Sequence, residues 1–255
     1  MLIRYLKKLT LLFITVFIYA QIFSQNTAAL FKEAQNLELK FDEPAALEKY
    51  KQIVSIDPYN VNALVKCVEY NCSIGSRQDD KVKNTFYTTA KNFALQAYNI
   101  NKADANACYA MALAAGKMTE VDDDNKIILE DVKEIKIYAD KALAADANHA
   151  KANYVLGKWH FELIRLSWLK RAAIKAFYGG IPDTQIDSAA YYMEKCRSLE
   201  PYFALNYLDL VKVYAYDHQP AKAIEVLNKL VKLPNRSFDD AAIKDEGKKL
   251  LATMQ

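Results

Sequence analysis

Apolar and small residues recur with the same spacing in three parts of the chain, and each run ends at a proline. Offsets of four, three and five residues separate the members of two runs, Ala46, Tyr50, Ile53 and Pro58, and Ala189, Met193, Cys196 and Pro201. A third run, Ala223, Leu227 and Leu230, meets Pro234 one residue sooner. Residues three and four apart share one face of an α-helix, and the position before a proline disfavours helix. Each run therefore predicts a helix with one buried face and a defined end.

The runs belong to five helix–turn–helix units. The second and fourth units have longer connections, and the fourth contains an insert at about residues 164–186. Gly157 in the fourth unit predicts a close approach of two helices, and Ser237 with Asp240 predicts a capping box before a last helix. A helix pair of this kind buries its apolar face only against its neighbours, so the units have to stack.

The units resemble tetratricopeptide repeats. Together with the spacing, this resemblance predicts an all-α fold, a right-handed α-α superhelix of about five helix pairs with a C-terminal capping helix. We expect residues 26–255 to form a single domain.

In such a stack the first helix of each pair lines the concave face. The repeat frame places eleven residues there, most of them apolar or aromatic: Phe31, Gln35, Leu64, Val68, Tyr109, Leu113, Tyr154, Lys158, Phe161, Leu208 and Lys212. A mainly apolar groove with a few lysines suits an amphipathic partner helix or an acyl chain with an anionic head. The insert can also fold back into the groove, in which case these residues are core.

Residues 1–25 have the pattern of an export signal. Arg4, Lys7 and Lys8 precede an apolar run of twelve residues, 9–20, and Ala20, Ser24 or Gln25 can mark the cleavage point. The run is shorter than the ~20 residues of a membrane-spanning helix. We therefore expect a signal peptide over 1–25 and a mature protein in the periplasm or cell envelope; the alternative is an uncleaved N-terminal membrane anchor.

Removal of this segment changes the charge balance. The full chain has 34 Lys and Arg against 31 Asp and Glu, a formal net charge of +3. Arg4, Lys7 and Lys8 are the charged residues of the segment, so the mature chain has no net charge. Binding to a nucleic acid requires a positive surplus, and we expect no nucleic-acid partner.

The chain contains no motif of a catalytic or metal site. Zinc-helix, nucleophile-elbow and phosphate-loop patterns are absent, and the loop at Asp122 lacks the glycine and glutamate that a calcium loop needs. We predict no enzyme activity, no cofactor and no metal. The four cysteines, Cys67, Cys72, Cys108 and Cys196, are expected as buried free thiols, although an exported chain can also oxidise a pair from different helices.

The insert combines aromatic and basic residues. Its candidate binding residues are Trp159, Trp168, Lys170, Arg171, Lys175 and Tyr178. Indole and phenol rings beside cations suit a lipid headgroup zone. The other interpretation is that the rings pack under the insert and the cations face solvent.

A helix that runs into Leu166, Ser167 and Trp168, followed by a basic segment and by Phe177, Tyr178, Gly179 and Pro182, resembles the regulator of microtubule dynamics family. The stretch from Leu227 to Pro234 with Asp239 and Asp240 after it is similar to the same family, and the resemblance covers about residues 30–253. It implies a tetratricopeptide-like fold without catalysis, and some eukaryotic members bind phospholipid through this domain. An exported chain does not meet microtubules, so the cytoskeletal role is not carried over.

Two functions follow from these patterns. We expect a non-catalytic, exported helical-repeat protein that acts as a protein-interaction scaffold for a protein or peptide partner. The alternative is binding or transfer of a phospholipid or fatty-acyl ligand in the concave groove.

Overall fold

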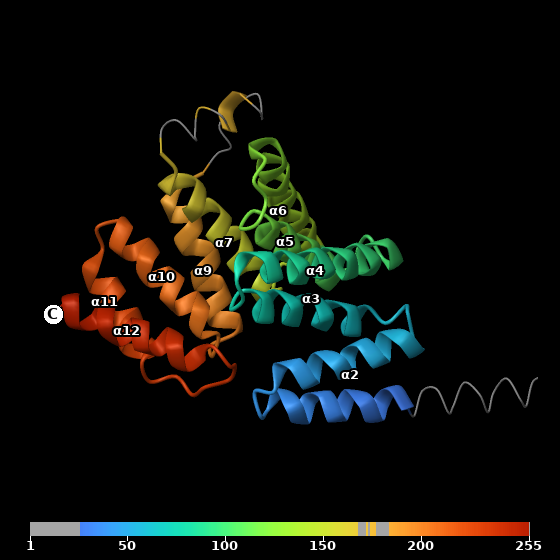
Figure 1. Cartoon of the computed structure of the whole chain (residues 1–255). Helices are drawn as coiled ribbons and strands as arrows, with labels where there is room; N and C mark the ends of the chain where they lie inside the picture. The colour runs from blue at the N-terminus through green and yellow to red at the C-terminus, as the bar shows by residue number, and fades with distance from the viewer. Residues whose placement is uncertain (1–25, 168–171, 173, 177–183, 255) are drawn as a thin grey trace, which may run out of the picture.

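The computed structural model describes residues 26–167, 172, 174–176 and 184–254, and these residues contain helices and no strand. Ten of the described helices form five antiparallel pairs that stack in chain order, and one further helix follows at the end (Figure 1). A short helical stretch at 174–176 lies in the insert between the helices of the fourth pair. The predicted all-α fold of five pairs with a C-terminal cap is therefore confirmed.

The bounds of the helices follow the repeat frame. A helix over 26–38 pairs with α2 (Glu43–Ile56), α3 (Val61–Gly75) with α4 (Asp80–Ile100), and α5 (Ala105–Met118) with α6 (Asn125–Ala145). The last pairs are α7 (Ala150–Arg165) with α9 (Ile186–Leu199) and α10 (Ala204–Tyr216) with α11 (Pro220–Leu230), followed by α12 (Asp240–Met254). None of the described helices has the length and apolar character needed to cross a membrane.

Short polar side chains cap the starts of the helices α2 to α6. The side-chain oxygens of Asp42, Asn60 and Asp104 accept the backbone N–H three residues later at 3.2, 3.1 and 2.8 Å. An N-cap of this kind satisfies one of the donors that a helix start leaves open and contributes about 1 kcal/mol. Local sequence thus marks where these five helices begin, whereas α9, α10 and α11 begin without a side-chain cap.

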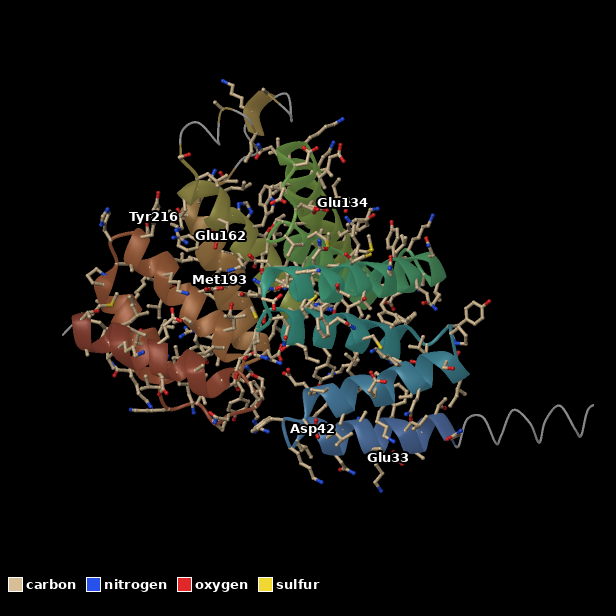
Figure 2. All side chains as sticks on the ribbon, in the orientation of Figure 1. Glu33, Asp42, Glu134, Glu162, Met193 and Tyr216 are labelled. Atoms are coloured by element: carbon tan, nitrogen blue, oxygen red, sulfur yellow. The ribbon has the colours of Figure 1, made fainter. Side chains whose placement is uncertain are left out.

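Small residues at the helix crossings allow the pairs to approach closely. Ala46, Ala189 and Ala223, the first residues of the three spaced runs, are fully buried. At Gly157 an added Cβ would lie 2.8 Å from Cγ of Met193 and 3.0 Å from the carbonyl oxygen of Ala189. Met193 lies in the interior beside α7 (Figure 2), and the predicted close approach at Gly157 is confirmed.

The four cysteines are buried and free. Burial raises the pKa of the Cys67, Cys72 and Cys196 thiols to about 12. The prediction of buried free thiols is confirmed, and these groups stay protonated and unreactive at neutral pH.

The start of the last helix differs from the predicted capping box. The helix begins at Asp240, and the carbonyl of Asp239 accepts the first helical bond, from the N–H of Ile243 at 3.0 Å. Asp240 is buried, and its carboxylate accepts the N–H groups of Arg236 and Ser237 at 2.6 and 3.0 Å. The predicted contact between Ser237 and Asp240 is present, because the carboxylate of Asp240 also accepts the Ser237 hydroxyl at 2.5 Å. The helix begins three residues after Ser237, so only this half of the capping box forms.

The insert joins α7 to α9 and occupies residues 166–185. Ile174 is buried in the same apolar cluster as Trp159 and Leu163, so this point of the insert packs onto the stack. Lys175 is exposed. The other predicted insert residues, Trp168, Lys170, Arg171 and Tyr178, lie outside the described residues.

Candidate binding groove

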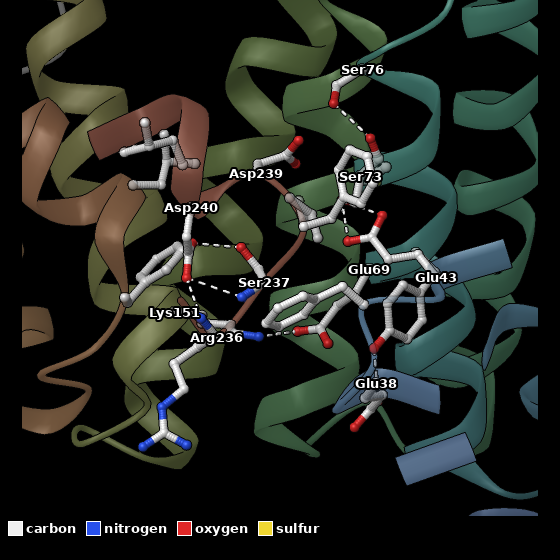
Figure 3. Close-up of a pocket in the computed structure, with 18 of the residues that line it drawn as sticks. Glu38, Glu43, Glu69, Ser73, Ser76, Lys151, Arg236, Ser237, Asp239 and Asp240 are labelled. Atoms are coloured by element: carbon white, nitrogen blue, oxygen red, sulfur yellow. Dashed lines mark hydrogen bonds and ion pairs between the residues drawn. The ribbon is translucent and has the colours of Figure 1, made fainter. Parts of the chain in front are cut away.

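Two adjoining cavities of about 390 and 680 Å³ lie on the inner face of the stack. Their walls come from the helix over 26–38, α3 and α5, from the first turn of α7, from residues 200–205 and from the loop that enters α12 (Figure 3). Six residues line both cavities, and we call them the shared belt: Glu38, Lys66, Glu69, Tyr109, Lys151 and Glu200. The cavities and the belt together are the groove.

Glu69 is the centre of the belt. Its carboxylate accepts hydrogen bonds from Nζ of Lys151 at 2.7 Å and from the hydroxyl of Tyr109 at 3.2 Å, and Lys66 lies 3.7 Å away. Burial alone raises the pKa of Glu69, but the two lysines and the two hydrogen bonds outweigh it and lower the pKa to about 2. Burial by itself lowers the pKa of Lys151, but the nearby carboxylates, above all Glu69, outweigh burial and raise the pKa above its ordinary value. The pair stays ionised at every physiological pH.

Glu38 is the member of the belt that comes from the first helix, residues 26–38. Its carboxylate accepts hydrogen bonds from the hydroxyls of Tyr50 and Tyr70, each at 2.8 Å, and Lys66 lies 3.1 Å away. The rings of Tyr50 and Tyr70 stack with centroids 6.0 Å apart. The first two helix pairs thus present an ordered, polar wall to the groove.

A second charged cluster lies on the C-terminal half of the inner face. The carboxylate of Asp209, which is buried, accepts hydrogen bonds from Tyr154 at 2.8 Å, Lys158 at 3.0 Å and Lys212 at 3.4 Å. Burial by itself raises the pKa of Asp209, and these partners lower it below its usual value. Three of the predicted groove residues are therefore committed to one buried carboxylate.

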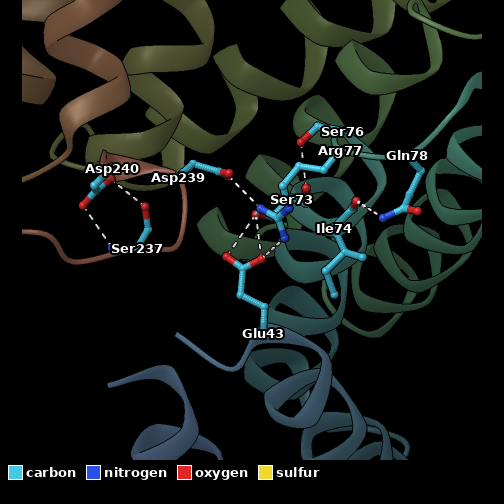
Figure 4. Close-up of polar contacts among 9 residues, drawn as sticks. All are labelled: Glu43, Ser73, Ile74, Ser76, Arg77, Gln78, Ser237, Asp239 and Asp240. Carbon is cyan, nitrogen blue, oxygen red and sulfur yellow. Dashed lines mark hydrogen bonds and ion pairs between the residues drawn. The ribbon is translucent and has the colours of Figure 1, made fainter. Parts of the chain in front are cut away.

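Arg77 connects the two ends of the stack. Its guanidinium donates to Glu43 of α2, to Ser73 of α3 at 3.2 Å and to Asp239 at 2.8 Å, and lies 4.5 Å from the ring centroid of Phe238 (Figure 4). Residues 162 positions apart in the chain are joined in this way. We call this contact the clasp; it lies beside the cavity that Glu43 and Asp239 line.

The predicted groove residues divide into three groups. Phe31, Gln35, Tyr109 and Leu113 line the cavities, and Tyr154, Lys158 and Lys212 surround Asp209. Leu64, Val68, Phe161 and Leu208 are 0, 0, 3 and 2% exposed and belong to the apolar core. For these four residues the predicted position in the groove was wrong, because their side chains pack against neighbouring helices.

The charged members of the belt were not predicted from the sequence, although the sequence contains a pattern that marks them. Polar residues follow one another along α3 at offsets of four, three, four and three: Asn62, Lys66, Glu69, Ser73 and Ser76. This spacing marks one helix face, and it is the face that lines the groove. The groove is lined by charged and aromatic side chains together and not by Leu64 and Val68, and the lipid alternative stays an untested prediction.

The described residues contain no group of three or more His, Cys, Asp or Glu side chains arranged to hold a metal ion. His160 is buried and stacks on the ring of Tyr192, with centroids 5.8 Å apart. Trp159 is buried too, and its indole N–H donates to the carbonyl of Val132 at 2.9 Å. This part of α7 packs on its neighbours and does not line the groove.

The overall fold is similar to that of a known repeat protein. The crystal structure of TTC0263, a thermophilic TPR protein in Thermus thermophilus, superposes with a TM-score of 0.60, covering 89% of this chain and 98% of that chain at 11% identity. At this identity the likeness shows the fold alone.

Sequence comparison gives the family. The family model of regulator of microtubule dynamics proteins 1–3 matches residues 30–255. Regulator of microtubule dynamics protein 1 of Caenorhabditis elegans is 25% identical over 72% of this chain and 80% of its own length, and protein 3 of Xenopus laevis is 28% identical over 66% of this chain but 36% of its own length. The chain belongs to the regulator of microtubule dynamics 1–3 family.

Proposed function

We propose that this chain is a non-catalytic interaction scaffold whose groove holds a segment of a partner protein. The observation that carries the proposal is the shared belt: two cavities join along one inner face, and their common wall is charged, aromatic and ordered. Tetratricopeptide-like stacks generally present such a face to a protein or peptide. A wall of ionised and hydrogen-bonding groups fits a polypeptide backbone and its polar side chains better than an acyl chain.

Site-specific photo-crosslinking tests the proposal. A photoreactive amino acid replaces Leu113, which lines the groove, and in a second protein it replaces Thr88, an exposed residue on the outer helix α4. After irradiation in the native host, we expect a discrete adduct from position 113 that mass spectrometry assigns to a protein, and no equivalent adduct from position 88. Adducts from position 88 alone, or a lipid adduct from position 113, would contradict the proposal.

We also propose that the scaffold acts outside the cytoplasm. The support is the basic and apolar pattern of residues 1–25, which lie outside the described residues. Cell fractionation with mass spectrometry of the protein's first peptide should find a mature N-terminus near residues 21–26 in the envelope fraction. A protein that keeps residues 1–25 in the membrane fraction would support the anchor instead, and one in the cytosol would exclude export.

A further inference from the structure

We propose that the partner segment is basic, and that one of its lysine or arginine side chains pairs with Glu200 in the groove. The inference rests on the proposed function and adds the chemistry of the partner. It starts from the ions of the shared belt, which are three carboxylates and two ammonium groups.

Each ammonium group of the belt already has a carboxylate. Lys66 lies 3.1 Å from Glu38, and Lys151 lies 2.7 Å from Glu69. Glu200 makes no ion pair within 4 Å in the described part of the chain. The belt therefore presents one carboxylate that has no ion pair of its own and that lines both cavities, with Lys151 acting on it only from a longer distance.

The main chain holds Glu200 in place. Its N–H donates to the carbonyl of Cys196 at 2.8 Å, and its own carbonyl accepts the N–H of Phe203 at 3.2 Å. The residue ends α9 and is partly buried. Because the backbone is fixed on both sides, an incoming cation has to order only the side chain of Glu200 and not the main chain that carries it.

The complete lining of the two cavities also has more negative than positive side chains. Six carboxylates line the two cavities, Glu38, Glu43, Glu69, Glu200, Asp239 and Asp240, against four cations, Lys66, Lys117, Lys151 and Arg236. Burial lowers the pKa of His149, so this side chain is neutral at pH 7. Arg77 at the clasp offsets part of this excess, and Lys151 offsets part of the charge of Glu200, which helps to raise the pKa of Lys151. With Arg77 counted, the lining still has one more carboxylate than it has cations. An acidic cavity raises the local concentration of basic segments and repels acidic ones.

The rim of the groove already holds a guanidinium in this way. Arg77 lies between the carboxylates of Glu43 and Asp239, with the face of Phe238 against it. Aromatic side chains, among them Tyr109 and Phe203, also stand in the walls near Glu200. Carboxylates beside aromatic faces are the surroundings that arginine and lysine side chains prefer.

Fluorescence anisotropy with three labelled peptides tests the inference. Each peptide has about nine residues, ~30 Å when extended, with lysine, glutamate or glutamine at alternate positions and glycine or serine between them. On the mature protein we expect saturable binding of the lysine peptide, no saturable binding of the other two, and weaker binding as salt rises from about 50 to about 500 mM.

Two variants show whether Glu200 takes part. Glu200→Gln keeps the shape of the side chain and should weaken the lysine peptide about fivefold, which corresponds to ~1 kcal/mol for one partly screened ion pair. Glu225→Gln is the matched control, because Glu225 is exposed on α11 and pairs only with Lys229 there; it should bind like the unmodified chain. Equal thermal melting of the two variants excludes unfolding as the cause.

Several results would overturn the inference. They are an acidic or neutral peptide that binds as tightly as the lysine peptide, the absence of binding of the lysine peptide, or equal affinities of the Glu200→Gln and Glu225→Gln proteins. If photo-crosslinking at position 113 captures a protein segment that carries no basic side chain, the scaffold role stands and the basic partner is excluded. The failure of one proposal is thereby distinguished from the failure of the other.

Discussion

Glu69 shows how neighbouring cations keep a groove carboxylate ionised. Its pKa of about 2 is below the ordinary value of 4.5, so its contribution to stability is complete above about pH 4.5 and is lost as the pH falls towards 2. The Glu69→Gln protein should lose about 1–3 kcal/mol of unfolding free energy at pH 7, because Lys151 is left without its partner. Urea denaturation at pH 7 and pH 3 measures this.

The same measurement on Glu225→Gln gives the control, since that carboxylate is exposed and lies outside the groove. We expect a shift in the urea midpoint for Glu69→Gln alone, and a smaller difference from the unmodified chain at pH 3 than at pH 7. Equal midpoints at pH 7 would show that the pair with Lys151 adds no net stability.

The pKa of Asp131 is raised, whereas that of Glu69 is lowered. It is 2% exposed; burial raises its pKa to about 6, with Asp122 adding to the effect and Lys91 opposing it from 2.9 Å. The folded protein therefore keeps the proton up to about pH 6, whereas the unfolded chain loses it near pH 3.8. This group stabilises the fold at low pH, and its contribution falls by ~2 kcal/mol as the pH rises from about 4 to about 6.

Asp131→Asn removes that titration. Because other carboxylates have the opposite slope, the informative quantity is the difference in unfolding free energy between the unmodified protein and the variant. We expect this difference to change between pH 4 and pH 6 and to be flat above pH 7. A constant difference across the whole range would mean that Asp131 is ionised throughout.

At the scale of helices, the close approach of α7 and α9 depends on Gly157. A methyl group there would meet Cγ of Met193 at 2.8 Å and the main chain of Ala189 at 3.0 Å, and a backbone atom cannot move aside cheaply. Gly157→Ala should therefore lower the unfolding free energy by about 1–3 kcal/mol despite the better helix propensity of alanine.

Gly116→Ala is the matched control, since the added methyl group would meet only Ile135, at 3.8 Å. Alanine should leave stability unchanged or raise it by up to ~1 kcal/mol. Thermal melting of both variants distinguishes a packing effect from a propensity effect. If the two substitutions shift the melting temperature equally, the crossing at Gly157 tolerates a side chain.

The buried faces and the ends of the helices depend on residues that are close together in the sequence. The spaced runs at Ala46 and Ala189 predicted buried faces and ends because a 3.6-residue period and a proline act within one helix. The residues that line the groove could not all be predicted from this periodicity. Leu64 and Lys66 differ by two positions on α3, and only the packing of a third helix against it decides which of them faces the core.

The charged members of the groove depend on contacts over long separations. Glu69 and Lys151 are 82 residues apart in the chain, and a repeat frame with a fixed length does not pair them. The polar stripe from Asn62 to Ser76 identifies one wall of the groove. The opposite wall includes Glu200, which follows the last residue of α9, the second helix of its pair. Sequence periodicity predicts the face of a helix and does not predict its partner across a cavity.

At the scale of the whole molecule, the clasp decides whether the stack is an open arc or a closed ring. The loop that enters α12 lies beside the first two helix pairs (Figure 1), and Arg77 supplies the ion pairs and the cation–π contact that join them. Because Arg77 is 26% exposed and Asp239 is 35% exposed, salt screens this contact in part. The ring is therefore closed by a contact weaker than the core on either side of it.

Arg77→Ala should open the ring without unfolding the stack. The buried Glu43 loses its cation and Asp239 loses its partner, so hydrogen–deuterium exchange should rise in residues 235–240 and in the first turn of α2, while α5 and α6 keep their protection. Arg165→Ala is the control, since Arg165 pairs with Glu162 within α7 and should change neither region. Arg77→Lys should lie between the two, because a single ammonium group cannot serve both carboxylates as the planar guanidinium does. If Arg77→Ala leaves the exchange of residues 235–240 unchanged, packing of α12 on α11 holds the loop, and the ring does not depend on the clasp.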